Sequence, residues 1–127
     1  SLGVTVIPSG RALEYTPKQV LREADTAMYR VKHRGGAGHE VRVAKTPTAA
    51  VPRAKTLGRT EGFFKVIIDA RTDLILGAAI IGAEASEVVT SIQMAMLGDL
   101  TWQQVRDAVI THPTMSEGLN IVLDSLG

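Results

Sequence analysis

The chain has 127 residues, enough for one domain with a sizeable core, and its hydrophobic content of 45% is that of an ordinary globular protein. A formal net charge of +1 gives no electrostatic reason to expect nucleic-acid or membrane binding, and no apolar run is long enough to cross a bilayer. The sequence contains no cysteine, which excludes a disulfide scaffold, a thiolate nucleophile and a zinc–cysteine site among these residues. Since it also lacks the features of a signal peptide, we expect a cytoplasmic protein.

The first third of the chain is expected to hold a short strand followed by a long helix. Residues 3–7 are rich in β-branched side chains and end at a Pro-Ser-Gly turn signal. Thr16-Pro17 then has the pattern of a helix start, and apolar residues recur at helical spacing from Val20 until Gly35.

The middle of the chain carries the strongest strand signals. Val41 and Val43 alternate with more polar residues, as in a half-exposed strand, whereas the two prolines of residues 45–54 predict a connector or an edge segment. Residues 63–69 and 74–81 flank a four-residue turn and predict a β-hairpin. Gly77, inside the second of these strands, indicates a bulge or a close backbone approach.

Three helical stretches finish the sequence. Residues 84–97 carry apolar side chains on nearly all sides, which predicts burial on more than one face. A second, short helix starts at Thr101, and a third starts near Thr114. Strands in the first two-thirds and helices in the last third predict an α+β fold: a largely antiparallel sheet of about four to five strands with helices packed on one side.

The hexapeptide His112-Pro113-Thr114-Met115-Ser116-Glu117 is the candidate functional site. Pro113 restricts the residue before it to extended geometry, so the His112 imidazole is expected to project from a stiff loop. Glu117 follows Thr114 at the spacing of a capping box, in the helical turn where negative charge is favoured. A carboxylate beside a histidine can fix the tautomer of the ring, the usual preparation for acid–base work. The alternative is a loop histidine beside a helix cap, because capping and orientation of His112 compete for the same oxygens.

From about residue 39 to the end, the chain resembles the C-terminal dimerisation domain of the FAD-dependent pyridine nucleotide–disulphide oxidoreductases. The matching segments are VRVAKTPTAAVPRAKTLGRTEGFFKVIIDA, ILGAAIIGAEASEVV and AMLGDLTWQQVRDAVITHPTMSEGL, in the order in which the family has them. This resemblance implies a homodimer. It also implies that His112 works in trans, exchanging a proton with a redox-active thiol of the partner subunit while Glu117 orients the ring.

Residues 1–37 look like the end of a GGDEF (diguanylate cyclase) domain, through SLGVTV and ADTAMYRVKHRGG. The loop that holds nucleotide and metal in that family is absent, so no cyclase activity is expected. A GGDEF-like strand and helix stand where the oxidoreductase domain normally opens with a strand and a helix. We therefore expect one composite domain over residues 1–127, with residues 1–37 completing the sheet of residues 39–127.

The sequence has no GxGxxG loop for FAD or NAD(P)H and no cysteine pair, so it predicts no cofactor site and no catalysis by the chain alone. Three scattered histidines do not predict a metal site. The leading hypothesis is a dimerisation module. The alternatives are the C-terminal part of a flavin enzyme whose FAD- and NAD(P)-binding domains lie on another chain, and a degenerate GGDEF-type signalling fragment.

Overall fold

The computed structural model describes residues 5–8 and 40–127. Its secondary-structure elements follow one another in chain order as β1 (Thr5–Pro8), β2 (Val41–Pro47), the 3-10 turn η1 (Thr48–Ala50), α2 (Pro52–Leu57), β3 (Phe63–Asp69), β4 (Ile75–Gly82), α3 (Ala85–Leu97), α4 (Trp102–Arg106), the 3-10 turn η2 (Met115–Glu117) and α5 (Gly118–Asp124).

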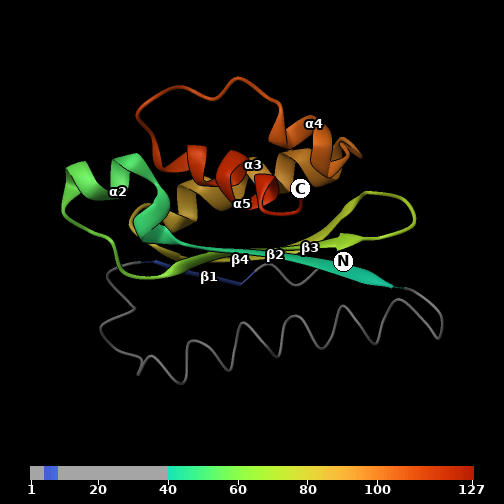
Figure 1. Ribbon diagram of the computed structural model, residues 1–127, viewed down its shortest axis with the longest axis horizontal. Coiled ribbons are helices and arrows are strands. Elements are labelled where there is room, and N and C mark those ends of the chain that lie inside the picture. The colour runs from blue at the N-terminus through green and yellow to red at the C-terminus, as the bar shows by residue number, and fades with distance from the viewer. Residues whose placement is uncertain (1–4, 9–39) are drawn as a thin grey trace.

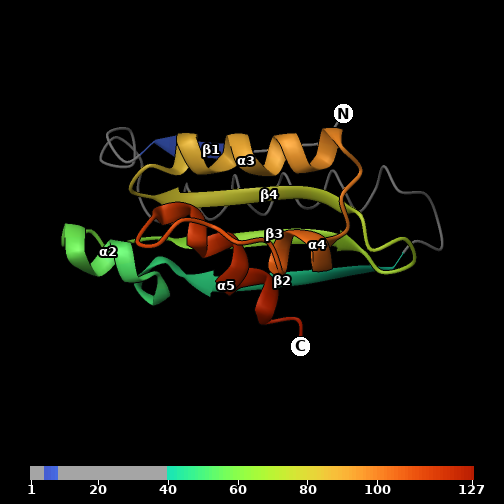
Figure 2. The same ribbon diagram turned by 90° about the horizontal axis from the view of Figure 1, so that it is seen from above.

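The strands form one sheet in the order β1-β4-β3-β2 (Figure 2). β2 pairs with β3 and β3 with β4 in antiparallel fashion, whereas β1 runs parallel to β4. The α+β class is confirmed, with three antiparallel strands in a sheet of four, at the low end of the four to five that we expected. The parallel pairing of β1 could not be predicted, because its partner β4 lies about seventy residues further along the chain, beyond the range of turn signals.

The predicted hairpin of β3 and β4 is confirmed, and its turn is closed by a side chain. The Asp69 carboxylate accepts hydrogen bonds from the backbone N–H groups of Arg71 (2.8 Å) and Thr72 (3.3 Å). The register shifts between Ile67, which lies opposite Gly77, and Ile68, which lies opposite Ile75. The irregularity expected near Gly77 is therefore present as a β-bulge.

The helices of the described residues all lie on one face of the sheet (Figure 1). Alternate residues of β3 point into this layer, as the period of two in a strand requires, and Phe64, Val66 and Ile68 are fully buried. They form one hydrophobic cluster with apolar residues of α3 and α5, among them Ile92 and Val122. The sheet and the two helices thus share a single core, on which the C-terminal segment is built.

The expectation of a connector or edge segment at residues 45–54 is wrong in its second half. β2 continues to Pro47, and Pro52 occupies the first turn of α2, so the two prolines mark the ends of elements. Proline suits a first helical turn because the N–H that it lacks would have no helical partner there. Thr48 between them is fully buried, and its hydroxyl donates to the Ile81 carbonyl oxygen (2.9 Å).

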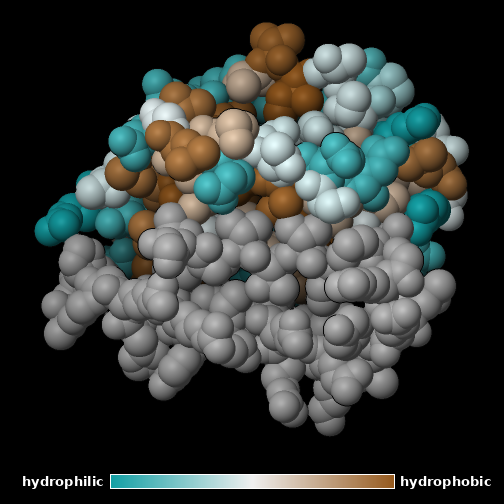
Figure 3. Space-filling model, turned by 180° about the vertical axis from the view of Figure 1, so that it is seen from behind, coloured by the Kyte–Doolittle hydropathy of each residue, from teal (hydrophilic) through white to brown (hydrophobic). Residues whose placement is uncertain are grey.

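Helix α3 forms within one residue of its predicted start, but it is buried on one face only. Ala85, Val88, Ile92 and Ala95 pack into the core, whereas Met94 and Leu97 are 57% and 69% exposed. We expected α3 to be buried on more than one face. In the single chain it is buried on one face, so this expectation is wrong. Figure 3 views the side on which α3 lies and shows hydrophobic side chains exposed there among polar ones.

None of the described helices is long and apolar enough to span a membrane. The helix expected between Thr16 and Gly35 lies outside the described residues.

Candidate functional site

His112 and Glu117 lie in direct contact. The Nδ1 atom of His112 is 2.9 Å from one carboxylate oxygen of Glu117 and 3.0 Å from the other. The His112 side chain is 66% exposed, as expected for an imidazole that projects from a loop, whereas that of Glu117 is only 17% exposed. In this pair, an exposed imidazole is therefore hydrogen-bonded to a carboxylate that is largely buried.

The carboxylate of Glu117 also caps the start of the following helical segment. The Thr114 backbone N–H donates to Oε2 of Glu117 (3.0 Å), and the Thr114 hydroxyl donates to the Thr111 carbonyl oxygen (2.6 Å). We expected capping and orientation of His112 to compete for the carboxylate oxygens, and this expectation is wrong. A carboxylate has about four acceptor positions, so one group serves both roles.

This arrangement fixes which nitrogen of His112 is available. A carboxylate only accepts hydrogen bonds, so the hydrogen of the neutral ring must lie on Nδ1, which leaves Nε2 as the free acceptor. The hydrogen bond from the Thr114 N–H holds the pKa of Glu117 below its ordinary value. The His112 ring acts in the same direction, and partial desolvation opposes both. Glu117 therefore stays ionised, as an orienter of His112 must.

A pH-dependent loss of stability follows from the lowered pKa of Glu117. Since its pKa is lower in the folded chain than the ordinary 4.5, the charged form stabilises the fold. This contribution is complete above the ordinary value and is lost as the pH falls through the folded-state value. We expect the stability difference between the wild type and Glu117→Gln, measured by urea unfolding, to shrink between about pH 6 and pH 3. Parallel pH profiles of the two proteins would contradict this role of the carboxylate.

Helix α4, which precedes the His112 loop, is anchored to the β3–β4 turn. The Trp102 indole N–H donates to Oδ1 of Asp73 (3.1 Å), and the Gln103 amide donates to Oδ2 (2.9 Å). Trp102 is 5% exposed, and the guanidinium groups of Arg42 and Arg106 lie 5.5 and 5.0 Å from its ring centroid. The buried Trp102 thus anchors α4 to the β3–β4 turn.

Two residues near the site were missed by sequence reasoning. Gly118 packs its bare Cα against the Phe64 ring, and the Asn120 side chain contacts backbone carbonyls at the end of α4. The position of Asn120, a polar residue between Leu119 and Ile121, could have indicated a side chain with a specific hydrogen-bond partner. Nothing in the sequence indicates the close contact of Gly118 with Phe64. His33 and His39 lie outside the described residues. In the part of the chain that the structure describes, no three metal-ligating side chains come together.

The comparisons with known proteins agree with this fold. The chain is 37% identical over 84 residues to the probable pyridine nucleotide-disulfide oxidoreductase RclA of Escherichia coli, covering 66% of this chain and 19% of that one. It is 40% identical over 90 residues to a dihydrolipoyl dehydrogenase of Thermus scotoductus, covering 71% and 20%. A solved structure of RclA, an HOCl-induced flavoprotein disulfide reductase, matches with a TM-score of 0.70 and 34% identity over 75% of this chain and 22% of that one.

The chain thus spans about a fifth of the length of these relatives. The comparisons give no support to the GGDEF resemblance of residues 1–37, most of which lie outside the described part. The family model for the dimerisation domain of the pyridine nucleotide-disulphide oxidoreductases matches residues 31–122. The chain belongs to this family.

Proposed function

We propose that this chain is a two-fold dimerisation module. The observation that carries the proposal is the outer face of α3, where Met94 and Leu97 lie three residues apart and are more than half exposed. Side chains at this spacing share one helix face, and the buried residues of α3 occupy the opposite one. Exposed apolar side chains that lie together on one helix face mark a candidate interaction site.

Two further exposed apolar residues follow α3 in the chain. Leu100 is 39% exposed and Val109 is fully exposed. In a two-fold dimer the same surface of both subunits meets itself, so the apolar face of α3 that carries Met94 and Leu97 can cover its own copy. A permanent interface of this kind buries more than about 2,000 Å² with an apolar centre.

The proposal includes a single domain over residues 1–127. The parallel pairing of β1 with β4, from Thr5 opposite Ala79 to Pro8 opposite Gly82, supports it because a segment before residue 39 then belongs to the sheet of residues 40–127. Early and clean proteolysis between Gly35 and His39 into separable pieces would contradict it. The GGDEF-like origin of residues 1–37 stays a prediction.

Substitution of Leu97 by glutamate tests the dimer. A charge at the centre of an apolar contact is expected to weaken association by at least about 2 kcal/mol, because the carboxylate loses its hydration without gaining a partner. We expect Leu97→Glu to shift the dissociation constant at least about thirtyfold in sedimentation equilibrium.

Thr60→Glu is the matched control, since it places the same charge on an exposed residue of the loop between α2 and β3. It should leave the dissociation constant unchanged. Equal effects of the two substitutions, or none from Leu97→Glu, would place the interface elsewhere.

The His112–Glu117 geometry supports a second candidate function: acid–base assistance in trans, as the family resemblance implies. Glu117 holds Nδ1, so Nε2 of the exposed ring is free to take the proton of a thiol on a partner. The thiol becomes a thiolate nucleophile and the ring becomes an imidazolium, and return of the proton completes the cycle. The thiol must come from residues beyond this sequence, which has no cysteine.

The described residues do not fit a flavin site. Among residues 40–127, the strand-to-helix junction that carries a glycine, as a phosphate-binding turn does, lies at Gly82, between β4 and α3. A Cβ at Gly82 would lie 3.1 Å from the Thr48 side chain and 3.3 Å from the Glu61 carbonyl oxygen. The space beside this glycine is thus filled by protein atoms and cannot admit a phosphate. FAD and NAD(P)H, which the family implies, would be held by other domains, and no step through them follows from these residues.

A further inference from the structure

His112 lies near the end of an exposed segment that makes few hydrogen bonds to the rest of the protein. Residues 107–113, between α4 and η2, arch away from the sheet (Figure 1), and all of them except Ile110 are exposed. Within the described part of the chain, no backbone–backbone hydrogen bond involves residues 109–113. We call residues 107–113 the His112 arm. Its conformation must depend on side chains: Ile110, which packs against the core, and the contacts at its two ends.

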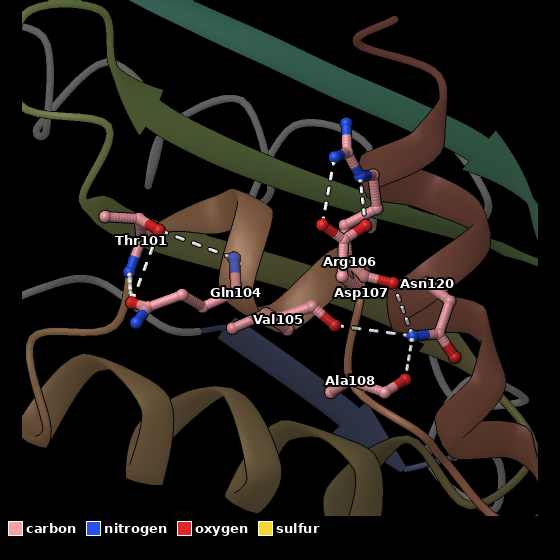
Figure 4. A network of polar contacts seen from close by, with 7 residues as sticks. All are labelled: Thr101, Gln104, Val105, Arg106, Asp107, Ala108 and Asn120. Atoms are coloured by element: carbon pink, nitrogen blue, oxygen red, sulfur yellow. Dashed lines mark hydrogen bonds and ion pairs between the residues drawn. The ribbon is translucent and has the colours of Figure 1, made fainter.

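The Asn120 side chain holds the first end of the arm. Its amide nitrogen lies 3.3 Å from the Val105 carbonyl oxygen, 2.9 Å from that of Arg106 and 3.1 Å from that of Ala108 (Figure 4). Carbonyl oxygens only accept hydrogen bonds, so the chemistry requires the nitrogen of this amide to face them. The last carbonyls of a helix have no intrahelical donor. Asn120 supplies one at the point where α4 becomes the arm.

Glu117 holds the second end, because it contacts His112 and the Thr114 N–H. Asn120 follows Glu117 by three residues, on the adjacent turn of the same continuous η2–α5 segment. This segment is fixed to the core by Met115, Leu119 and Val122, which are at most 2% exposed. Both ends of the exposed arm are therefore fastened to one buried, rigid support.

We propose that Asn120 is a positioning residue for His112, which it serves by fixing the first end of the arm relative to Glu117. With that end fixed, only residues 109–111 separate the Asn120 contact at Ala108 from His112. Without it, this end is held only by the backbone hydrogen bonds of Asp107 and Ala108 to the last turn of α4 and by Ile110, which packs against the core, so the ring can leave the carboxylate more easily. The role rests on the proposed use of His112, but the geometry of the arm is measurable in the chain itself.

NMR spectroscopy of the ¹⁵N-labelled chain tests this role. Asn120→Leu keeps the size of the side chain and removes the donor. Asn120→Asp keeps the shape of the side chain but places a carboxylate, which only accepts hydrogen bonds, beside three carbonyl oxygens. This second variant tests the same role if the leucine variant does not fold. At alkaline pH the imidazole ¹⁵N shifts report which nitrogen of neutral His112 carries the hydrogen. Backbone order parameters report the motion of residues 109–113.

The wild type should show the hydrogen on Nδ1 and order parameters near the value of about 0.85 that marks a rigid backbone. In both Asn120 variants the Nδ1-protonated form should fall at least about twofold, the change expected when one hydrogen bond of ordinary strength stops holding the arm. Order parameters of residues 109–113 should fall toward about 0.6. Unchanged tautomer and order in a folded Asn120 variant would overturn the proposal and leave Asn120 as a helix cap alone.

Ser125→Ala is the matched control, because it removes a hydrogen bond to a backbone carbonyl, that of Val122, from the other end of the same helix. It should change neither readout, whereas Glu117→Ala should abolish the Nδ1 preference. Neither readout depends on a partner subunit or on a thiol. A failed dimer or complementation assay therefore leaves this test intact, and failure of this test leaves the proposed dimer intact.

Discussion

Replacement of His112 by alanine is expected to lower the activity that this chain restores to a reductase lacking its own dimerisation domain by about 10²–10⁴-fold. This range is the usual contribution of a positioned acid–base group. The expectation follows from the free Nε2 of a ring that Glu117 holds by Nδ1. The measurement is the rate of NAD(P)H-dependent disulfide reduction by a truncated reductase with added chain, wild type or His112→Ala.

A loss of dimerisation would imitate this result, so the variant must first be shown to have the wild-type mass in sedimentation. Glu117→Gln should retain more activity than His112→Ala, since it keeps the imidazole and loses only the charged orienter. Equal activities of wild type and His112→Ala in a restored enzyme would show that the histidine is not used.

Replacement of Gly118 by alanine is expected to lower the free energy of unfolding by about 1–3 kcal/mol, the usual cost of overpacking a core. A Cβ on Gly118 would lie 2.3 and 2.5 Å from two atoms of the Phe64 ring, which is fully buried in β3. Gly118 has ordinary helical backbone angles (φ −55°, ψ −25°), so the cost arises from space and not from conformation. Urea unfolding measures the change.

Gly98→Ala is the matched control for the Gly118 substitution. A Cβ at Gly98 would meet nothing closer than 3.5 Å, so its effect should stay below about 1 kcal/mol. Phe64→Leu removes the outer ring atoms and should relieve the clash, so the double variant should be more stable than the sum of the two single effects predicts. Strict additivity would show that the helix start moves away from Phe64 instead.

The elements that short-range signals define could be predicted from the sequence. The β3–β4 hairpin has a strong strand–turn–strand pattern, and α4 begins where Thr101 and Gln104 form a capping box. Features that depend on distant contacts could not be predicted. The parallel neighbour of β4 and the exposure of Met94 on α3 are set by packing between remote segments, which periodicity does not report.

The candidate site shows the same division. The His112–Glu117 contact follows from a spacing of five residues across a proline and a helix start, so the sequence was sufficient to predict it. The Asn120 contacts join residues 12 to 15 positions apart across two helices, and the Gly118–Phe64 contact joins a helix to a strand. These contacts exist only because the core places α5 against α4 and β3.

The mass of the wild-type chain in solution tests the central claim most directly. Sedimentation equilibrium at micromolar concentration should give twice the chain mass of 13.6 kDa, with Leu97→Glu shifted toward the single chain. A wild-type chain that has a mass of 13.6 kDa at micromolar concentration would contradict the account of a dimerisation module.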